Sequence, residues 1–165
     1  MLKKKTILPT EITRLIAKLA GEELYAHHLY LHIASQLQAR GLFGGMAFFE
    51  SESDAELGHF KKLRDFVNDC GGILPTPSVM ALTEEVKDLE DALDLYYEAE
   101  LNLLNKYLAA YKESDKNEFC LTEPLFLDFI NIQRESVGEA GDLLATYAIA
   151  KETKEVLLFD AKLKP

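Results

Sequence analysis

The sequence SESDAELGHF at residues 51–60 sets a carboxylate and an imidazole among apolar residues. Glu56 and His59 are three positions apart, so on a helix their side chains project from one face. The apolar residues Phe49, Phe60 and Leu63 fall on that same face. A carboxylate among apolar side chains costs several kcal/mol unless a partner compensates its charge. A metal ion is one such partner, although the Glu-x-x-His spacing by itself also fits a glutamate and a histidine on a surface.

Helical patterns dominate the chain on both sides of this segment, and strand patterns are nearly absent. Apolar residues spaced by three and four predict a first helix over residues 10–40 and a second over residues 46–69. Glycines within 41–45 break the pattern between them, and the Cys-Gly-Gly at 70–72 ends the second helix. These segments predict an antiparallel pair of long helices.

Two further long helices follow a long connection. The third begins after residues 82–85 and ends at a polar joint at 113–118, and the fourth has Thr122 as its N-cap and Pro124 in its first turn. The connection between the second and third helices carries two prolines and is about fifteen residues long, enough to cross the length of a bundle. An amphipathic piece at 156–163 predicts a short fifth helix. The fold class is therefore all-α, a four-helix bundle with a long crossover.

Each of the four long helices carries one polar residue at the centre of its apolar stripe: Glu23, Glu56, Glu100 and Gln133. Glu56 follows Glu23 by 33 positions, and Gln133 follows Glu100 by the same interval. Tyr30 and Tyr107 each follow the glutamate of their own helix by seven positions. The two hairpins therefore echo each other, and we expect their central polar residues to meet at one depth in the bundle.

Three buried carboxylates would repel one another, and two divalent cations would supply four positive charges against the three negative ones. An oxygen-rich site with one histidine suits iron or manganese better than structural zinc. Di-iron carboxylate bundles use a Glu from each of two helices and Glu-x-x-His from each of the other two. Here only one Glu-x-x-His is present, because Gln133 is followed at the corresponding position by Ser136.

At these residues the chain resembles the ferritin family, from about Pro9 to Leu163. The resemblance rests on GEELY at 21–25, Tyr30, AELGH at 55–59, NDCGG at 68–72, Glu100 and LFDAKL at 158–163. It implies a ferritin-like four-helix bundle with a short C-terminal fifth helix, assembled as a homo-oligomeric cage of twenty-four subunits. It also implies iron storage, with a ferroxidase centre that binds two Fe(II), oxidises them with O₂ or H₂O₂, and passes Fe(III) to a mineral.

The resemblance assigns roles to individual residues of this chain. Glu23 and His59 would hold the first iron, Glu56 would bridge the pair, and Glu100 would hold the second iron. Tyr30 resembles the tyrosine that ferritins keep beside the centre. These five residues are the expected catalytic set of the ferroxidase.

The fourth helix can be aligned in two ways. Gln133 would match the glutamine that non-haem ferritins keep near the centre, and it is the expected contribution of this helix to the metal site. Aligning the helix by Pro124 would instead move Glu135 or Glu139 toward the centre. Gln133 is preferred because its apolar neighbours face the core, whereas Glu135 shares a face with charged residues.

The chain also departs from the family pattern. Ala55 replaces a carboxylate that many ferritins carry beside the bridging glutamate. Gly58 and Lys61 stand where animal heavy-chain ferritins place acids on the inner surface, so a third iron site and the mineral-nucleating residues are not assigned. Leu57 stands where haem-binding bacterioferritins place methionine, so no haem is expected.

Bulk properties bound the remaining possibilities. The 165 residues suit a single domain over 1–165, and the net charge of −10 argues against a nucleic-acid partner. No apolar run is long enough to span a membrane, and the basic residues at 1–5 are not followed by a signal-peptide core. Cys70 and Cys120 form no C-x-x-C motif and fit reduced thiols in a cytoplasmic protein.

Other functions compete with ferroxidase storage. A non-cage di-iron or di-manganese peroxidase of the rubrerythrin kind usually carries two Glu-x-x-His motifs, and this chain has one. A small Dps-type cage shares its ligands between subunits, whereas these ligands occur in one bundle. A non-catalytic helical module leaves the three central glutamates unexplained.

An apolar band outside the core stripe of the first helix bears on assembly. It comprises Leu24, Tyr25, Leu29 and Leu31. A monomer seldom leaves such a band exposed, so the band predicts an interface between subunits.

Overall fold

The computed structural model describes residues 5–116 and 119–163, and every regular element in those residues is helical. The elements are α1 (Thr10–Ala39), α2 (Phe43–Asp69), α3 (Leu89–Lys116), the 3₁₀ turn η1 (Cys120–Thr122), α4 (Glu123–Glu152) and α5 (Val156–Lys162). The prediction of an all-α bundle with a short fifth helix is confirmed. No helix in the described residues is both long and apolar enough to cross a membrane.

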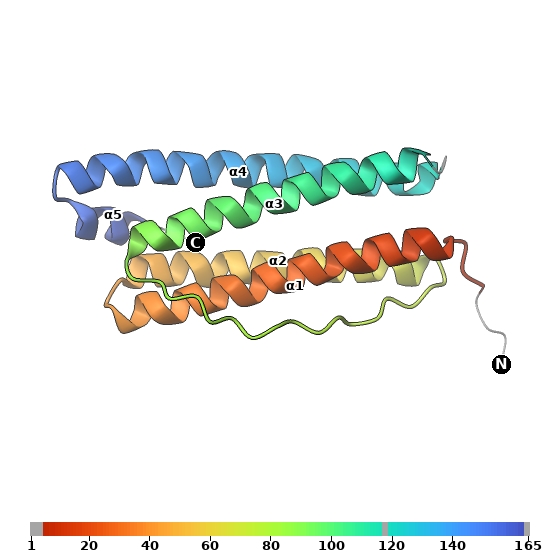
Figure 1. The fold of residues 1–165 in the computed structure, drawn as a ribbon, viewed down its shortest axis with the longest axis horizontal. Coiled ribbons are helices and arrows are strands. Elements are labelled where there is room, and N and C mark those ends of the chain that lie inside the picture. Colours follow the sequence, from red (N-terminus) through yellow and green to blue (C-terminus); the bar gives the residue numbers. More distant parts are fainter. Residues whose placement is uncertain (1–4, 117–118, 164–165) are drawn as a thin grey trace.

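Two antiparallel hairpins form the bundle (Figure 1). Helix α1 packs along α2, α3 packs along α4, and α1 also contacts α3. Residues 70–88 connect α2 to α3 and run back along the length of the bundle (Figure 1), which confirms the predicted crossover. Gly41 and Gly71 have φ angles of +77° and +81°, and they mark the predicted ends of α1 and α2 because this backbone conformation favours glycine.

The crossover is longer than predicted, because α3 begins at Leu89 instead of soon after residue 85. The side chain of Gln36 on α1 accepts a hydrogen bond from the backbone N–H of Val86 and donates one to the carbonyl oxygen of Glu84, both at 2.9 Å. These bonds tie the end of the crossover to α1. The tertiary contact therefore outweighs the helical pattern of the sequence at this point.

Helix α2 begins at Phe43, so Gly44 and Gly45 lie in its first turn. The prediction that these two glycines break the helical pattern is therefore wrong. The carboxylate of Asp160 on α5 accepts hydrogen bonds from the N–H groups of Gly45 at 2.8 Å and Gly44 at 3.2 Å. These N–H groups have no partner within their own helix, and the acid also suits the positive end of the helix dipole. A Cβ on Gly44 would lie 1.7 Å from the Asp160 carbonyl oxygen, so glycine is required for this approach.

The joint between α3 and α4 differs from the prediction in two details. Helix α3 continues through Lys116, so residues 113–116 of the predicted polar joint at 113–118 are helical. Glu118, at the end of that joint, lies outside the described residues, and so do residues 1–4 of the basic N-terminal segment. Thr122 is the N-cap residue of α4, but its side chain makes no capping hydrogen bond. Its hydroxyl instead bonds the Phe119 carbonyl oxygen at 3.1 Å.

The apolar band predicted on the outside of α1 is largely buried within the subunit. Leu24 and Leu29 are buried, whereas Leu31 remains 44% exposed. Pro77 and Val79 of the crossover line the same surface pocket as Tyr25, so the chain itself covers part of this face. The prediction of a four-residue exposed band is therefore wrong.

The apolar stripes of the four long helices meet in the centre of the bundle. The largest fully buried side chains are aromatic, and burial of a phenylalanine contributes about 1.5–3 kcal/mol. They include Tyr30, Tyr96, Tyr107, Phe126 and Phe129. Four central polar residues lie in the same core: Glu23, Glu56, Glu100 and Gln133.

Candidate metal centre

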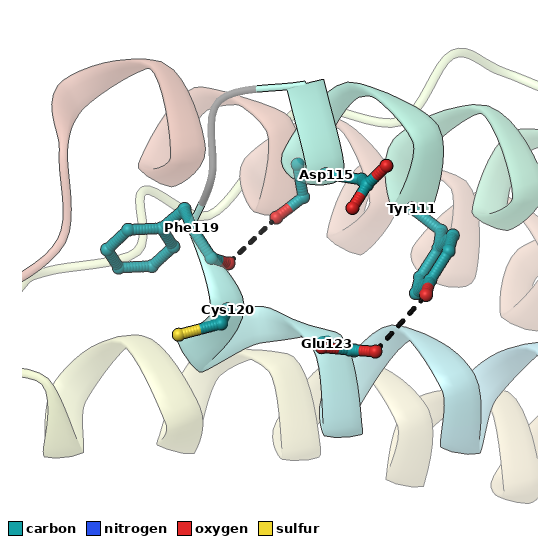
Figure 2. Close-up of a pocket in the computed structure, with 6 residues that line it drawn as sticks. Tyr111, Asp115, Phe119, Cys120 and Glu123 are labelled. Atoms are coloured by element: carbon teal, nitrogen blue, oxygen red, sulfur yellow. Dashed lines mark hydrogen bonds between the residues drawn. The ribbon is translucent and has the colours of Figure 1, made fainter.

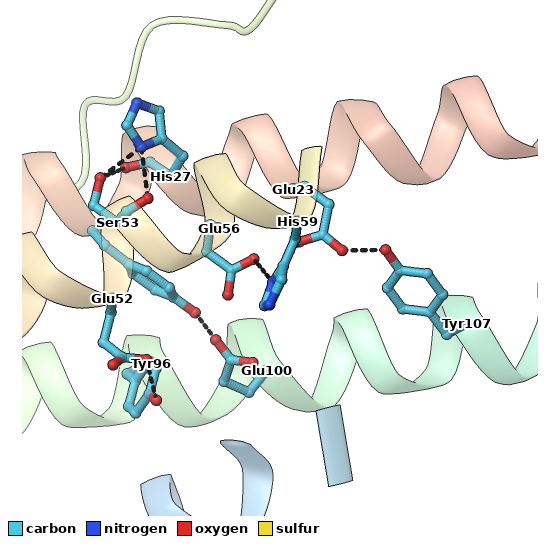
Figure 3. A network of polar contacts seen from close by, with 10 residues as sticks. Glu23, His27, Glu52, Ser53, Glu56, His59, Tyr96, Glu100 and Tyr107 are labelled. Atoms are coloured by element: carbon cyan, nitrogen blue, oxygen red, sulfur yellow. Dashed lines mark hydrogen bonds and ion pairs between the residues drawn. The ribbon is translucent and has the colours of Figure 1, made fainter. Parts of the chain in front are cut away.

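Glu23 from α1 and Glu56 and His59 from α2 converge in the middle of the bundle (Figure 3). One potential ligand atom from each lies within 4.8 Å of the others. The Nδ1 atom of His59 is 3.1 Å from Oε2 of Glu56 and 3.5 Å from Oε2 of Glu23. The spacing of three positions places Glu56 and His59 on the face of α2 that packs against α1.

Glu100 on α3 and Gln133 on α4 are also buried, and Glu100 does not belong to this cluster of three. Glu23 and Glu100 each have a buried Oε2 atom without a hydrogen-bond partner, and both polar side-chain atoms of Gln133 lack one. An unpaired buried polar group costs about 1–3 kcal/mol. We call these buried residues, together with Glu56 and His59, the central layer. Buried polar atoms without a hydrogen-bond partner fit a site that binds an oxygen-preferring cation.

Burial governs the protonation of Glu56 and Glu100. It raises the pKa of Glu56 to about 8, with a further contribution from Glu23 beside it. Burial also raises the pKa of Glu100 to about 8, and the negative charge of Glu56 adds to the effect. Both acids therefore tend to hold a proton near neutral pH, which binding of a cation would displace.

His59 experiences opposing effects. Burial acts to lower its pKa, but the adjacent carboxylates of Glu23 and Glu56 together outweigh burial and raise the pKa to about 10. The imidazole therefore carries a proton at neutral pH when no metal is bound. It must lose that proton before Nδ1 can bind a metal, because only the neutral ring offers a lone pair.

Two buried tyrosines hold carboxylates of the layer. The hydroxyl of Tyr30 donates a hydrogen bond to Glu100, and the hydroxyl of Tyr107 donates one to Glu23. Burial, followed by the nearby glutamates, raises the pKa of both tyrosines well above 10.0, so both remain proton donors. Tyr30 was expected beside the centre. The contact of Tyr107 was not predicted, although its place seven residues after Glu100 was a signal in the sequence.

On α4, Gln133 is fully buried, whereas Glu135 and Glu139 are exposed. The orientation expected for this helix is therefore the one found. Glu52 on α2 was not among the expected site residues; its carboxylate accepts a hydrogen bond from Tyr96 at 2.8 Å (Figure 3). Burial raises the pKa of Glu52, and Glu139 contributes to that shift, so the acidic environment extends beyond the central layer.

A separate pocket of about 260 Å³ lies where α3 meets η1 and α4 (Figure 2). Tyr111, Asp115, Cys120 and Glu123 are among the residues that line it. Tyr111 donates a hydrogen bond to Glu123 at 3.2 Å across the pocket. None of the unpaired buried polar atoms found in the described residues lies here, so the central layer is the better candidate for a metal site. Neither Cys70, which is buried, nor Cys120, which is exposed, forms a disulfide within the described residues.

Comparison with known proteins identifies the family to which the chain belongs. The sequence profile of the ferritin family, described as a ferritin-like domain, matches residues 13–149. The chain is 26% identical over 113 residues to the bacterial non-heme ferritin of Campylobacter jejuni. The aligned segment covers 65% of this chain and 68% of that protein. It is 24% identical over 100 residues to a "probable bacterial non-heme ferritin-like protein" of Haemophilus influenzae. That match spans 61% of either chain.

The fold is shared with solved structures as well. The open pore ferritin of the archaeon Archaeoglobus fulgidus superimposes with a TM-score of 0.90 at 24% identity, covering 94% of this chain and 96% of that one. The family profile spans most of the residues, including all four central polar positions. This chain therefore belongs to the ferritin family, and the curated relatives that it matches are of the bacterial non-haem type.

Proposed function

We propose that this protein is an iron-storage ferritin whose di-iron centre oxidises Fe(II) to Fe(III), which the protein then keeps as a ferric mineral in a cage. One observation carries the proposal: in a member of the ferritin family, Glu23, Glu56 and His59 converge in the core, where Glu23 and Glu100 each keep a carboxylate oxygen without a hydrogen-bond partner. Neither a surface cluster nor a packed apolar core would need such an arrangement.

The donor set supports iron as the substrate. Carboxylate oxygens with a single imidazole suit iron, and two Fe(II) ions would offset the three buried carboxylate charges. Binding would displace the protons that burial retains on Glu56 and Glu100, whose pKa values are raised to about 8. We therefore expect iron uptake to release protons and to strengthen as the pH rises.

Each member of the set has a role in this proposal. Glu23 and His59 hold the first Fe(II), Glu56 bridges the two ions, and Glu100, fixed by Tyr30, holds the second. A bridging carboxylate keeps two metals at roughly 3.5–4 Å, a separation suited to two-electron chemistry. Each Fe(II) gives up one electron, and the two electrons with two protons convert O₂ into H₂O₂, or H₂O₂ into two water molecules.

Gln133 supports the second half of the centre from α4. Its amide is fully buried and both polar atoms lack a partner, so the oxygen can face a cation or a water bound to one. An amide oxygen carries no net charge, so its contribution is smaller than that of a carboxylate. Glu135 and Glu139, being exposed, are not assigned to the centre.

The subunit surface supports assembly. Large apolar side chains remain exposed on several elements, including Leu31, Phe43, Leu101 and Leu157. Scattered apolar residues are ordinary on a surface, but family membership favours their burial between copies of the chain. We propose a homo-oligomeric cage of twenty-four subunits in the cytoplasm. We also propose that the cage binds no haem, because Leu57 offers no thioether to ligate haem iron.

Particle mass and iron content, measured together, test the proposal. Light scattering should give a particle many times the 18.6 kDa of the chain, and aerobic addition of Fe(II) should load far more than two irons per subunit. A monomer or small dimer that stops at two metals per chain and consumes H₂O₂ catalytically would favour the non-cage peroxidase instead. A stoichiometric Soret band that survives desalting would contradict the haem-free assignment.

A further inference from the structure

Tyr30 and Tyr107 make reciprocal contacts between the two hairpins. The hydroxyl of Tyr107 on α3 donates a hydrogen bond to Oε1 of Glu23 on α1 (Figure 3). The hydroxyl of Tyr30 on α1 donates one to Oε1 of Glu100 on α3. Both tyrosines are completely buried. Because each follows the glutamate of its own helix by seven positions, the two tyrosines occupy equivalent places and serve each other's glutamate.

Each tyrosine engages only one oxygen of its carboxylate. A phenol has a single proton to donate. The remaining oxygens, Oε2 of Glu23 and Oε2 of Glu100, are the buried atoms without a hydrogen-bond partner. Oε2 of Glu23 lies 3.5 Å from Nδ1 of His59, so the free oxygen points into the centre. The tyrosines therefore determine which oxygen each glutamate presents.

The ring of Tyr107 is held in turn by α4. It stacks on Phe129 with 4.7 Å between ring centroids and 6° between planes. Phe129 also meets the ring of His59 edge to face, at 5.6 Å and 78°. One aromatic pair therefore contacts both residues proposed to hold the first iron, Glu23 through a hydrogen bond and His59 through ring packing.

We propose that Tyr107 is a positioning residue of the metal centre, which fixes Glu23 as a one-oxygen ligand and, through Phe129, braces His59. Tyr30 performs the equivalent task for Glu100 at the second metal. The inference rests on the proposed function, because it requires a cation between these carboxylates. Tyr107 acts through Glu23 and contacts no iron itself.

Metal binding to the iron-free cage under anaerobic conditions tests this, with Zn(II) for calorimetry and Co(II) for its visible spectrum. Tyr107→Phe keeps the ring and removes only the donor, so the fold should persist. One of the two sites should weaken by roughly 10- to 100-fold, the range seen when a hydrogen-bond partner of a metal ligand is lost. The Co(II) spectrum should shift toward a higher coordination number, because Glu23 can then use both oxygens.

Two further variants test whether the loss of affinity is specific to the site that contains Glu23. Tyr30→Phe should weaken the other site and leave the first unchanged. Tyr111→Phe is the matched control, because Tyr111 lies one turn further along α3 and its hydroxyl bonds Glu123, away from the centre, at 3.2 Å. This control should bind both metals as the wild type does.

The outcomes separate this inference from the proposed function. If Glu23→Ala loses a site while Tyr107→Phe keeps wild-type affinity and spectrum, Tyr107 only fills the core and the inference is overturned while the function stands. A lower melting temperature in Tyr107→Phe with unchanged metal affinity would overturn the inference in the same way. If Glu23→Ala keeps both sites intact, the metal centre lies elsewhere and both proposals fall.

Discussion

The molecule buries acids in two regions, and their surroundings differ. At one end of the bundle, Asp160 on α5 has both carboxylate oxygens engaged by the N–H groups of Gly44 and Gly45. In the middle, Glu23 and Glu100 each keep one carboxylate oxygen without a hydrogen-bond partner. The acid at the end of the bundle is thus fully bonded within the fold, whereas these two acids in the middle each have one carboxylate oxygen without a hydrogen-bond donor from the described residues.

The difference teaches how to separate stability from binding among buried acids. Unpaired N–H groups and the partial positive charge at the start of α2 compensate Asp160 within the fold. In the middle, the protonated imidazole of His59 lies beside Glu23 and Glu56, yet burial still raises the pKa values of Glu56 and Glu100 to about 8. A fully bonded buried acid indicates a structural role, and an incompletely bonded one indicates a ligand.

The largest expected effect is at Glu56, the proposed bridge. Glu56→Ala should abolish the fast phase of Fe(II) oxidation, a loss greater than the roughly 10- to 100-fold typical for residues that only support a ligand. Stopped-flow absorbance at two Fe(II) per subunit measures it, with particle mass checked in parallel. Asp160→Ala should keep the fast phase, and exposed Glu135→Ala is a second control. Wild-type oxidation in Glu56→Ala would show that iron is oxidised elsewhere.

The next effect is a pH dependence that the central acids should impose on the metal-free protein. Glu56 and Glu100 titrate near 4.5 when unfolded and near 8 in the fold, so between these values the folded state holds more protons. Raising the pH through this window should lower the free energy of unfolding, by up to about 1.4 kcal/mol per pH unit and group. His59 acts in the same direction, because its stabilising contribution is present below 6.5 and is lost as the pH rises through about 10.

Thermal unfolding of the metal-free cage at about pH 6 and about pH 9 measures this slope. Glu56→Gln should make this slope shallower, because the amide is neutral at both pH values, and Glu135→Gln should leave the slope unchanged. A metal-free protein that became more stable with rising pH would contradict the account of the central layer.

A smaller effect is expected where the acid is fully bonded. Asp160→Ala should lower the stability by about 1–2 kcal/mol, because it removes the acceptor for two N–H groups at the start of α2. Thermal unfolding at constant protein concentration measures it, and exposed Asp142→Ala is the matched control. If Asp160→Ala slowed Fe(II) oxidation as much as Glu56→Ala, the separation between the two regions would be lost.

The smallest effect is expected at Gln133, which is buried and unpaired but uncharged. Gln133→Ala should change the oxidation rate only modestly, by less than roughly 10-fold, because a neutral amide supports a cation less than a carboxylate does. Stopped-flow oxidation compared with Glu135→Ala measures it. A crystal structure soaked in Fe(II) with Glu135 or Glu139 bound to the metal would overturn the alignment chosen for α4.

The sequence by itself determined the four long helices and the burial of the central polar layer. Periodicity is a local property, so the spacing of apolar residues placed Glu23, Glu56, Glu100 and Gln133 on core-facing stripes, and the structure buries all four. The orientation of α4 follows in the same way, with Gln133 inside and Glu135 outside. The length of the proline-containing connection and the amphipathic pattern at 156–163 also predicted the crossover and the fifth helix, which the structure contains.

Only the tertiary structure decided the contacts between segments distant in the sequence. The hydrogen bond from Tyr107 to Glu23 joins α3 to α1, and no local pattern specifies it. The hydrogen bond from Gly44 to Asp160 stabilises the first turn of α2, where the sequence predicted a break. The hydrogen bond between Gln36 and Val86 holds the end of the crossover, and α3 begins later in the chain than predicted. In each case, one partner lies dozens of positions away, so the energy of the contact depends on packing that periodicity does not encode.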